Sequence, residues 1–210
     1  MARRRIIGLN ANAFSFQGSL PDFMHSPLKV MQGIIEAPIT FIDIENYYDI
    51  ESLSKKLQDL KEYKGWMDLD SEIRSRFIYL NISEQAMKEL LPIPFSKCVM
   101  QRIFEILEVL DCIVQETDNN TGQLSALGQE LRDRHFVGDK AWFTDESSTN
   151  KANFKDKLAF KDPDDPSRSI TCTWHGKIKT PQIRIHFQWP LPVGQKYLKV
   201  VYIGPKITKA

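Results

Sequence analysis

Two different spacings of apolar residues run along this chain. Intervals of three and four residues, typical of amphipathic helices, dominate its middle. The longest such run predicts a helix over about 97–116, apolar on more than half of its circumference and therefore central in the fold. Shorter helices are predicted from near Leu53 to Gly65, over 83–91 and over 123–135. The residues that mark the longest helix are Val99, Ile103, Leu107, Leu110 and Val114.

Strict alternation of apolar and polar residues replaces this pattern after residue 165. Alternation predicts one strand over 170–178 and another over 182–189, each with one apolar and one polar face. A more evenly apolar strand follows over 197–203, as a central or doubly covered position requires. We therefore expect the three to form an antiparallel sheet.

The first part of the chain also contains β-branched runs. Strands are predicted over 5–10 and over 39–44, with a loop region rich in Gly and Pro between them. The segment 71–82 fits a helix by its apolar spacing and a strand by its run of β-forming residues. Both structures remain open for it.

Charge divides at nearly the same point as the hydrophobic pattern. The last acidic residue is Asp165, and residues 168–210 carry eight of the 28 Lys and Arg residues. The chain before residue 168 therefore contains 20 basic residues and all 27 acidic ones. The predicted fold class is α+β: an acidic, mainly helical part over 1–165 and a basic antiparallel sheet over 166–210. We expect this sheet to pack on the longest helix and to form one compact unit with the first part.

The polar face of the predicted sheet collects the candidate functional residues. In an antiparallel register, His175 and Lys177 of one strand share a face with Arg184 and His186 of the next. Cations and imidazoles on a sheet can bind phosphate, and a near-neutral imidazole can transfer a proton. The alternative is a non-enzymatic interaction protein whose basic face docks on acidic protein surface, either its own or a partner's. The sequence therefore favours RNA, DNA or an acidic protein as partner and leaves open whether this is an enzyme.

Part of this sheet resembles a known family. The segments 175–179, 183–185 and 200–206 are similar in layout to the C-terminal sheet of RelE/ParE-type bacterial toxins. The resemblance covers about forty residues and implies a messenger-RNA cleavage that uses basic and aromatic side chains in place of a metal. By this resemblance, the residues to test are Lys177, Arg184, Tyr202 and Lys206.

A second, local pattern lies in the first part of the chain. The apolar strand over 39–44 delivers Asp43 and Glu45 at its end, as strands do in magnesium-dependent nucleases of the NYN and PIN type. The simpler interpretation is that Asp49, or Asp43 and Glu45, caps or precedes the helix that follows. We favour capping.

The remaining composition narrows the class of protein. The three cysteines are an odd number at wide spacing, which argues against a disulfide framework and against metal ligation by cysteine. No metal or cofactor is expected. No run of apolar residues is long enough to cross a bilayer, and the N-terminal one is too short for a secretory signal. We therefore expect a cytoplasmic protein that does not bind membranes, and the sequence does not set its oligomeric state.

Overall fold

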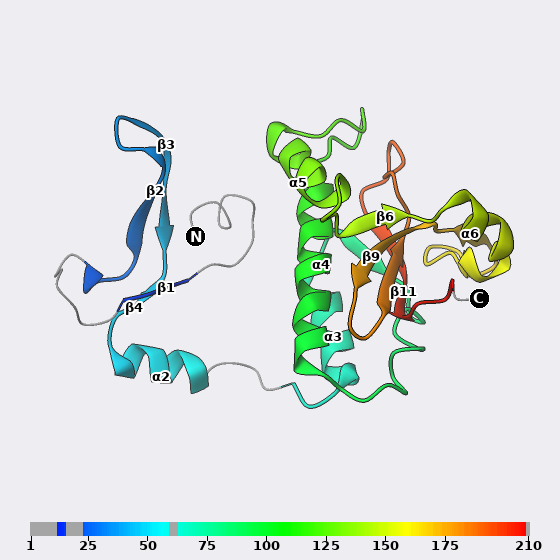
Figure 1. The fold of residues 1–210 in the computed structure, drawn as a ribbon, viewed down its shortest axis with the longest axis horizontal. Helices are drawn as coiled ribbons and strands as arrows, with labels where there is room; N and C mark the ends of the chain where they lie inside the picture. The colour runs from blue at the N-terminus through cyan, green and yellow to red at the C-terminus, as the bar shows by residue number, and fades with distance from the viewer. Residues whose placement is uncertain (1–11, 16–22, 59–62, 209–210) are drawn as a thin grey trace. The chain divides into compact units, whose positions relative to one another are not determined.

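The computed structural model describes residues 12–15, 23–58 and 63–208. The chain forms two compact units, Met1–Glu62 and Tyr63–Ala210 (Figure 1). This division differs from the boundary expected after residue 165. The C-terminal strands hydrogen-bond to strands that precede residue 165, so no division falls there. The strand predicted over 5–10 lies outside the described residues.

The described residues of the first unit form two small sheets and one helix. Strand β2 (Leu28–Ile34) pairs with β3 (Ala37–Ile44) as an antiparallel hairpin, and β1 (Ala13–Phe14) pairs in parallel with β4 (Asn46–Tyr47). The strand predicted over 39–44 is confirmed within β3. Helix α2 (Ile50–Gln58) follows.

Asp49 opens helix α2. Its Oδ1 accepts the backbone N–H of Ser52 at 2.6 Å, which satisfies one of the N–H groups that lack partners at a helix start. Asp43 and Glu45 are exposed, and Glu45 lies 3.8 Å from the ammonium of Lys56. The capping interpretation is therefore confirmed for Asp49.

The second unit is built on a five-stranded sheet in the order β5-β11-β10-β9-β6. The three strands predicted near the end of the chain lie in it as antiparallel neighbours, β9, β10 and β11. Strand β6 adds to them in antiparallel and β5 joins β11 in parallel, so the sheet is mixed. The bounds of these strands are Leu80–Ile82 for β5, Phe143–Asp145 for β6, Trp174–Ile178 for β9, Ile183–Phe187 for β10 and Leu198–Pro205 for β11.

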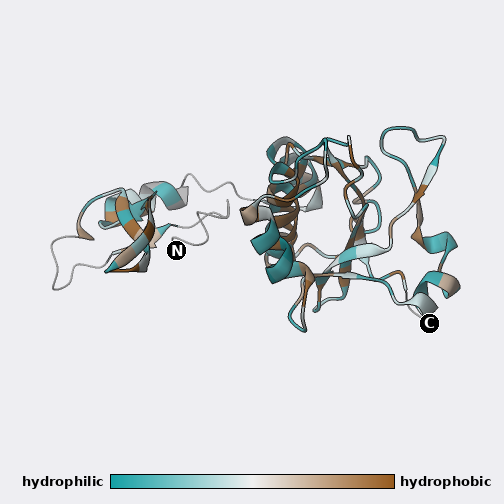
Figure 2. Cartoon of the chain, turned by 90° about the horizontal axis from the view of Figure 1, so that it is seen from above, coloured by the Kyte–Doolittle hydropathy of each residue, from teal (hydrophilic) through white to brown (hydrophobic). Residues whose placement is uncertain are grey.

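Helices cover one face of this sheet. The longest, α4 (Lys97–Gln115), packs against β5, β9 and β11, with α3 (Trp66–Arg76) and α5 (Ala126–Phe136) beside it (Figure 1). Hydrophobic residues concentrate on α4 and on the strands next to it (Figure 2). The close approach requires Gly176, because a Cβ there would lie 2.8 Å from Cγ2 of Ile106. Both helices and sheets are present, so the chain is α+β.

A smaller layer covers part of the opposite face. Strands β7 (Ala159–Lys161) and β8 (Ser169–Thr171) form a hairpin, and the ring of Phe160 packs on His186 and Tyr202 with centroids 5.5 and 5.9 Å apart. The short helix α6 (Ser148–Asn153) and the 3-10 helix η2 (Asp156–Leu158) precede the hairpin. The strand predicted over 170–178 is therefore divided: its first part pairs with β7 as far as Cys172, whose N–H bonds to Leu158, and its second part forms β9.

Two other expectations are resolved by local backbone geometry. The ambiguous segment 71–82 is both helix and strand, since α3 ends at Arg76 and β5 begins at Leu80. The helix predicted over 83–91 is wrong. That segment forms successive turns that bond i to i+3 and bury Ala86, Met87 and Leu90, and prolines 92 and 94 prevent any continuation. None of the helices in the described ranges combines the length and the apolar character needed to cross a bilayer.

A buried histidine near the end of α5 makes stability depend on pH. His135 is 3% exposed, and neither of its ring nitrogens has a hydrogen-bond partner among the described residues. Burial, with the nearby Arg134 and Arg102, lowers the pKa of His135 to about 4 from the usual 6.5. The neutral ring therefore stabilises the fold above pH 6.5, and this contribution is lost as the pH falls toward 4.

We expect His135→Phe to make unfolding less pH-dependent between pH 6.5 and 4. Wild-type unfolding in this range takes up a proton at His135, and the variant lacks that proton. The slope of the unfolding free energy against pH therefore falls by up to about 1.4 kcal/mol per pH unit. Urea unfolding at several pH values measures this slope. His25→Gln, which changes an exposed histidine of the first unit, is the control. An unchanged slope in His135→Phe would contradict the assignment.

Candidate functional site

One row of polar side chains crosses four strands of the sheet. In the pairing register, Thr144 of β6 stands opposite His175 of β9, His175 opposite His186 of β10, and His186 opposite Tyr202 of β11. The neighbouring row places Lys177 opposite Arg184. The sheet therefore brings the four residues predicted from alternation onto one face.

This face is not an open surface at the histidines. His186 is fully buried, and His175 is 5% exposed, under the hairpin β7–β8 and the segment around α6. Burial lowers the pKa of His175 to about 4, although the Glu146 carboxylate acts in the opposite direction. Burial, with the charge of His175, lowers the pKa of His186 to about 3. Both imidazoles are neutral at pH 7.

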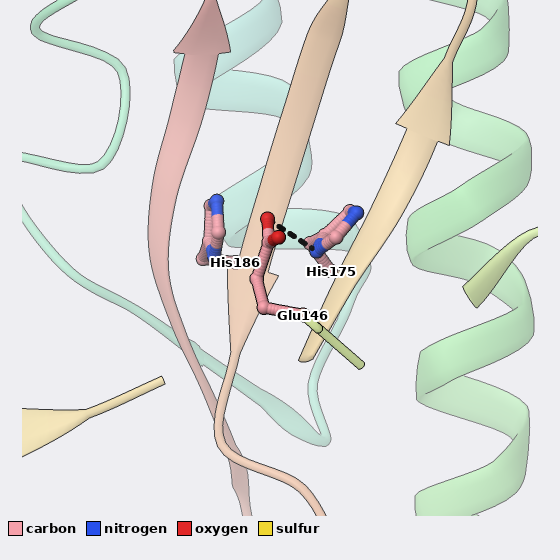
Figure 3. A group of neighbouring side chains, drawn as sticks. All are labelled: Glu146, His175 and His186. Carbon is pink, nitrogen blue, oxygen red and sulfur yellow. Dashed lines mark ion pairs between the residues drawn. The ribbon is translucent and has the colours of Figure 1, made fainter. Parts of the chain in front are cut away.

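Glu146 completes a cluster with the two histidines. It follows directly after β6, and its carboxylate lies between the two rings (Figure 3). Its Oε1 is 3.4 Å from Nδ1 of His175. The same oxygen accepts the hydroxyl of Thr208 at 3.0 Å, and Oε2 accepts the amide of Asn150 at 2.7 Å. The carboxylate is therefore held in one orientation by two neutral donors.

The hydrogen bonds of His186 determine its tautomer. Nδ1 lies 3.1 Å from the carbonyl oxygen of Cys172. Since a carbonyl can only accept, Nδ1 carries the proton and Nε2 carries the lone pair. Nε2 is buried and has no partner in the part of the chain that the structure describes. The cluster thus contains a buried nitrogen lone pair that no protein donor satisfies.

Two cations lie in the row beside this cluster. The guanidinium of Arg184 donates through one nitrogen to the carbonyl oxygens of Ile178 and Ile183, at 3.2 and 2.9 Å. Burial lowers its pKa, and the charge of Glu146 partly offsets this. Burial, and then the charges of Arg184 and Lys179, also lower the pKa of Lys177. Positive charges crowd one another here.

Tyr202 and Lys206 occupy different environments. Tyr202 is buried, and its hydroxyl donates to the carbonyl of Pro205 at 2.7 Å. Burial, with the charge of Glu89, raises its pKa to about 12. Lys206 is half-buried, and its backbone N–H donates to Gln182. Tyr202 therefore joins the buried row, while Lys206 follows the last residue of β11 and is not part of that row.

A groove opens at the end of the sheet where β9 turns into β10. It has a volume of about 590 Å³ and is bordered by the first turn of α4, the segment 139–142 and the residues 177–180. Four cations line it against one carboxylate, Asp139. These cations are Arg102, Lys140, Lys177 and Lys179.

Among the described residues, Arg102 is the one cation of the groove that pairs with a carboxylate. Arg102 lies 2.7 Å from Glu105 and stacks on the ring of Trp142 at 3.6 Å. Within the described ranges, no ion pair is formed by Lys140, Lys177 or Lys179. The first turn of α4 adds no acidic side chain. The groove therefore presents uncompensated positive charge together with the N-terminal end of a helix.

Comparison of this chain with protein-family models, with curated proteins and with solved structures found no match. Its function must therefore be inferred from its own residues.

Sequence reasoning found some members of these sites and missed others. It identified His175, Lys177, Arg184 and His186, which the sheet places together. It missed Glu146, because this residue lies in the polar run 144–157, where apolar residues do not recur at the spacing of a helix or a strand. It also missed Lys140 and Arg102, which reach the groove from a loop and a helix.

Proposed function

We propose that this protein binds nucleic acid through the cationic groove at the end of the sheet. The observation that carries the proposal is the excess of cations in that groove, which is lined by four basic residues and one acidic residue. Phosphate contacts by Lys and Arg supply most of the affinity of non-specific nucleic-acid binding. A groove that holds several of them is suited to a phosphate backbone.

Crowding of like charges supports the same proposal. The lowered pKa of Lys177 reflects burial first and then the charges of Arg184 and Lys179. An anion bound between these groups relieves their repulsion and stabilises the charged lysine. The positive end of the α4 helix dipole, which has no acidic side chain in its first turn, also favours an anion here.

The buried row favours binding over the messenger-RNA cleavage that the toxin resemblance implies. Such a reaction requires Tyr202 to reach a phosphodiester, yet Tyr202 is buried and its hydroxyl donates to the carbonyl of Pro205. Lys177 belongs to both the resemblance and the groove. Our proposal keeps that residue as a phosphate contact and assigns no catalytic step to it.

An acidic protein partner is the second candidate, and one observation favours it. The basic end of the chain already docks on carboxylates of its own fold, since the ammonium of Lys199 contacts Asp162 and Asp164. The groove cations Lys140, Lys177 and Lys179, which form no ion pair within the described ranges, would contact carboxylates of a second protein in the same way. A nucleic-acid titration separates the two candidates.

We expect the wild type to bind single-stranded RNA or DNA at low salt, with affinity that falls steeply as salt rises. The double variant Lys140→Glu and Lys179→Glu should bind about tenfold or more weakly at 50 mM salt, because each reversal removes a phosphate contact and adds repulsion. Fluorescence anisotropy of a labelled oligonucleotide measures both effects.

The matched control is Lys196→Glu, together with a second reversal at Lys151. Both side chains are exposed or partly exposed and lie away from the groove, Lys196 in the loop at the opposite end of β10. This control changes net charge by the same amount and should weaken binding much less. Equal losses in both double variants would show a response to net charge alone. Absence of wild-type binding would favour the acidic protein partner.

A further inference from the structure

Three side chains that come from separate segments converge at one buried point of the second unit. They are Glu146 after β6, His175 on β9 and His186 on β10. Each offers one possible ligand atom, and these atoms all lie within 4.8 Å of one another. Burying a carboxylate and two imidazoles at one point is costly unless each polar atom is satisfied.

The distances within the cluster do not match a good internal ion pair. Nδ1 of His175 and Oε1 of Glu146 are 3.4 Å apart. A charge-assisted hydrogen bond between such groups would bring them to about 2.8 Å. By contrast, a nitrogen and an oxygen that both bind one tetrahedral Zn²⁺ at about 2.1 Å are separated by about 3.4 Å.

The second feature is the unsatisfied lone pair. His186 is held by its Nδ1–H on the carbonyl of Cys172, which leaves Nε2 buried and without a donor among the described residues. A histidine whose other nitrogen donates to a backbone carbonyl is the usual form of a metal ligand. The ring is therefore fixed in the tautomer that a metal ion requires.

The surroundings of Glu146 complete the pattern. Thr208 and Asn150 each donate to one of its oxygens, at 3.0 and 2.7 Å. Neither donor carries charge, so the carboxylate keeps its negative charge for an ion. Oriented carboxylates with such partners are a regular feature around metal ligands.

We propose that Glu146, His175 and His186 form a binding site for a divalent transition-metal ion of the zinc type. Two imidazoles and one carboxylate suit ions that accept mixed nitrogen and oxygen ligands, whereas Mg²⁺ and Ca²⁺ prefer oxygen alone. The buried position, with His175 and Glu146 5% and 7% exposed, leaves narrow contact with solvent. This proposal is independent of nucleic-acid binding at the groove.

The test is equilibrium dialysis of the full-length protein, stripped with a chelator, against Zn²⁺. Cys98 is exposed and could bind zinc at the surface, so Cys98→Ser is the background for every variant. We expect one Zn²⁺ per chain with micromolar or tighter affinity and no comparable binding of Mg²⁺. His175→Ala and His186→Ala should each weaken Zn²⁺ binding at least 100-fold.

Two further variants make the result decisive. His135→Ala removes a buried histidine of the same unit outside the cluster and should leave Zn²⁺ affinity within about twofold. Thr208→Val keeps all three ligands but removes one donor to Glu146, and should weaken binding about tenfold. Thr208→Val therefore still tests the metal site if the histidine variants fail to fold. Failure of the wild type to bind Zn²⁺ stoichiometrically, or unchanged binding in Thr208→Val and the histidine variants, would overturn the proposal.

Discussion

Replacing Lys199 with Met is expected to destabilise the second unit by about 3 kcal/mol, the typical loss when one partner of a buried ion pair is removed. The ammonium of Lys199 lies 2.6 Å from Asp162 and 2.7 Å from Asp164. Both side chains of the Lys199–Asp162 pair are 9% exposed. Met keeps the length and the apolar stem of Lys but leaves the Asp162 carboxylate buried without its cation. Urea unfolding at pH 7 measures the loss.

The double variant Lys199→Met with Asp162→Asn is the matched control. It removes both charges, so we expect it to be clearly more stable than Lys199→Met alone. If the single and double variants unfold alike, the ion pair is not the cause. The pair also joins β11 to the segment after β7, so its loss should loosen the layer that covers the histidines.

The effect of Lys199→Met should shrink in acid. Burial by itself raises the pKa of Asp162, but the hydrogen bonds from Lys199 and from the Asp164 backbone outweigh it and hold the pKa below its usual 3.8. A lowered carboxyl pKa stabilises the fold above pH 3.8, and that stability is lost as the pH falls through the folded value. The difference between wild type and variant should therefore diminish below pH 3.8.

Replacing Gly176 with Val is expected to destabilise the second unit by about 3 kcal/mol, since overpacking a tight core forces side chains or backbone to shift. A Cβ at this position would lie 2.8 Å from Cγ2 of Ile106 and 3.3 Å from the ring of Phe143. Valine adds two more carbons to a space that cannot hold one. Thermal or urea unfolding measures the change.

A second substitution tests whether the helix contact is responsible. Ile106→Leu removes the Cγ2 methyl while conserving side-chain volume, so Gly176→Ala should cost less in the Ile106→Leu background than in the wild type. Equal costs in both backgrounds would mean that the clash with α4 is not what excludes a side chain. The glycine would then have another role.

Much of the secondary structure could be predicted because its causes are local. The apolar spacing of α4 and the alternation in β9 and β10 each reflect burial of one face, and Ser96 caps α4 by accepting the N–H of Val99. Alternation also predicted the shared face of His175, Lys177, Arg184 and His186, because register follows from which face is buried. These features required no knowledge of distant residues.

The sequence did not reveal which polar residues are covered. Alternation left open whether the polar face with His175 and His186 is exposed or covered, and in the structure both histidines are buried. The covering hairpin extends to Cys172, whose N–H bonds to Leu158 in register with β7 and β8, and β9 begins only at Trp174. Local pattern contains no signal for a second layer on the polar face.

The two candidate sites, the histidine cluster and the cationic groove, also combine residues that local pattern predicts with residues that distant segments contribute. Alternation and charge alone predict that cations and imidazoles gather on one sheet in a segment that contains no carboxylate. The fold brings Glu146 to the histidines, and Arg102 and Lys140 to the lysines, from 29 to 77 residues away in the sequence. Contacts of this kind arise from packing between elements, and packing depends on the whole fold instead of on neighbouring residues.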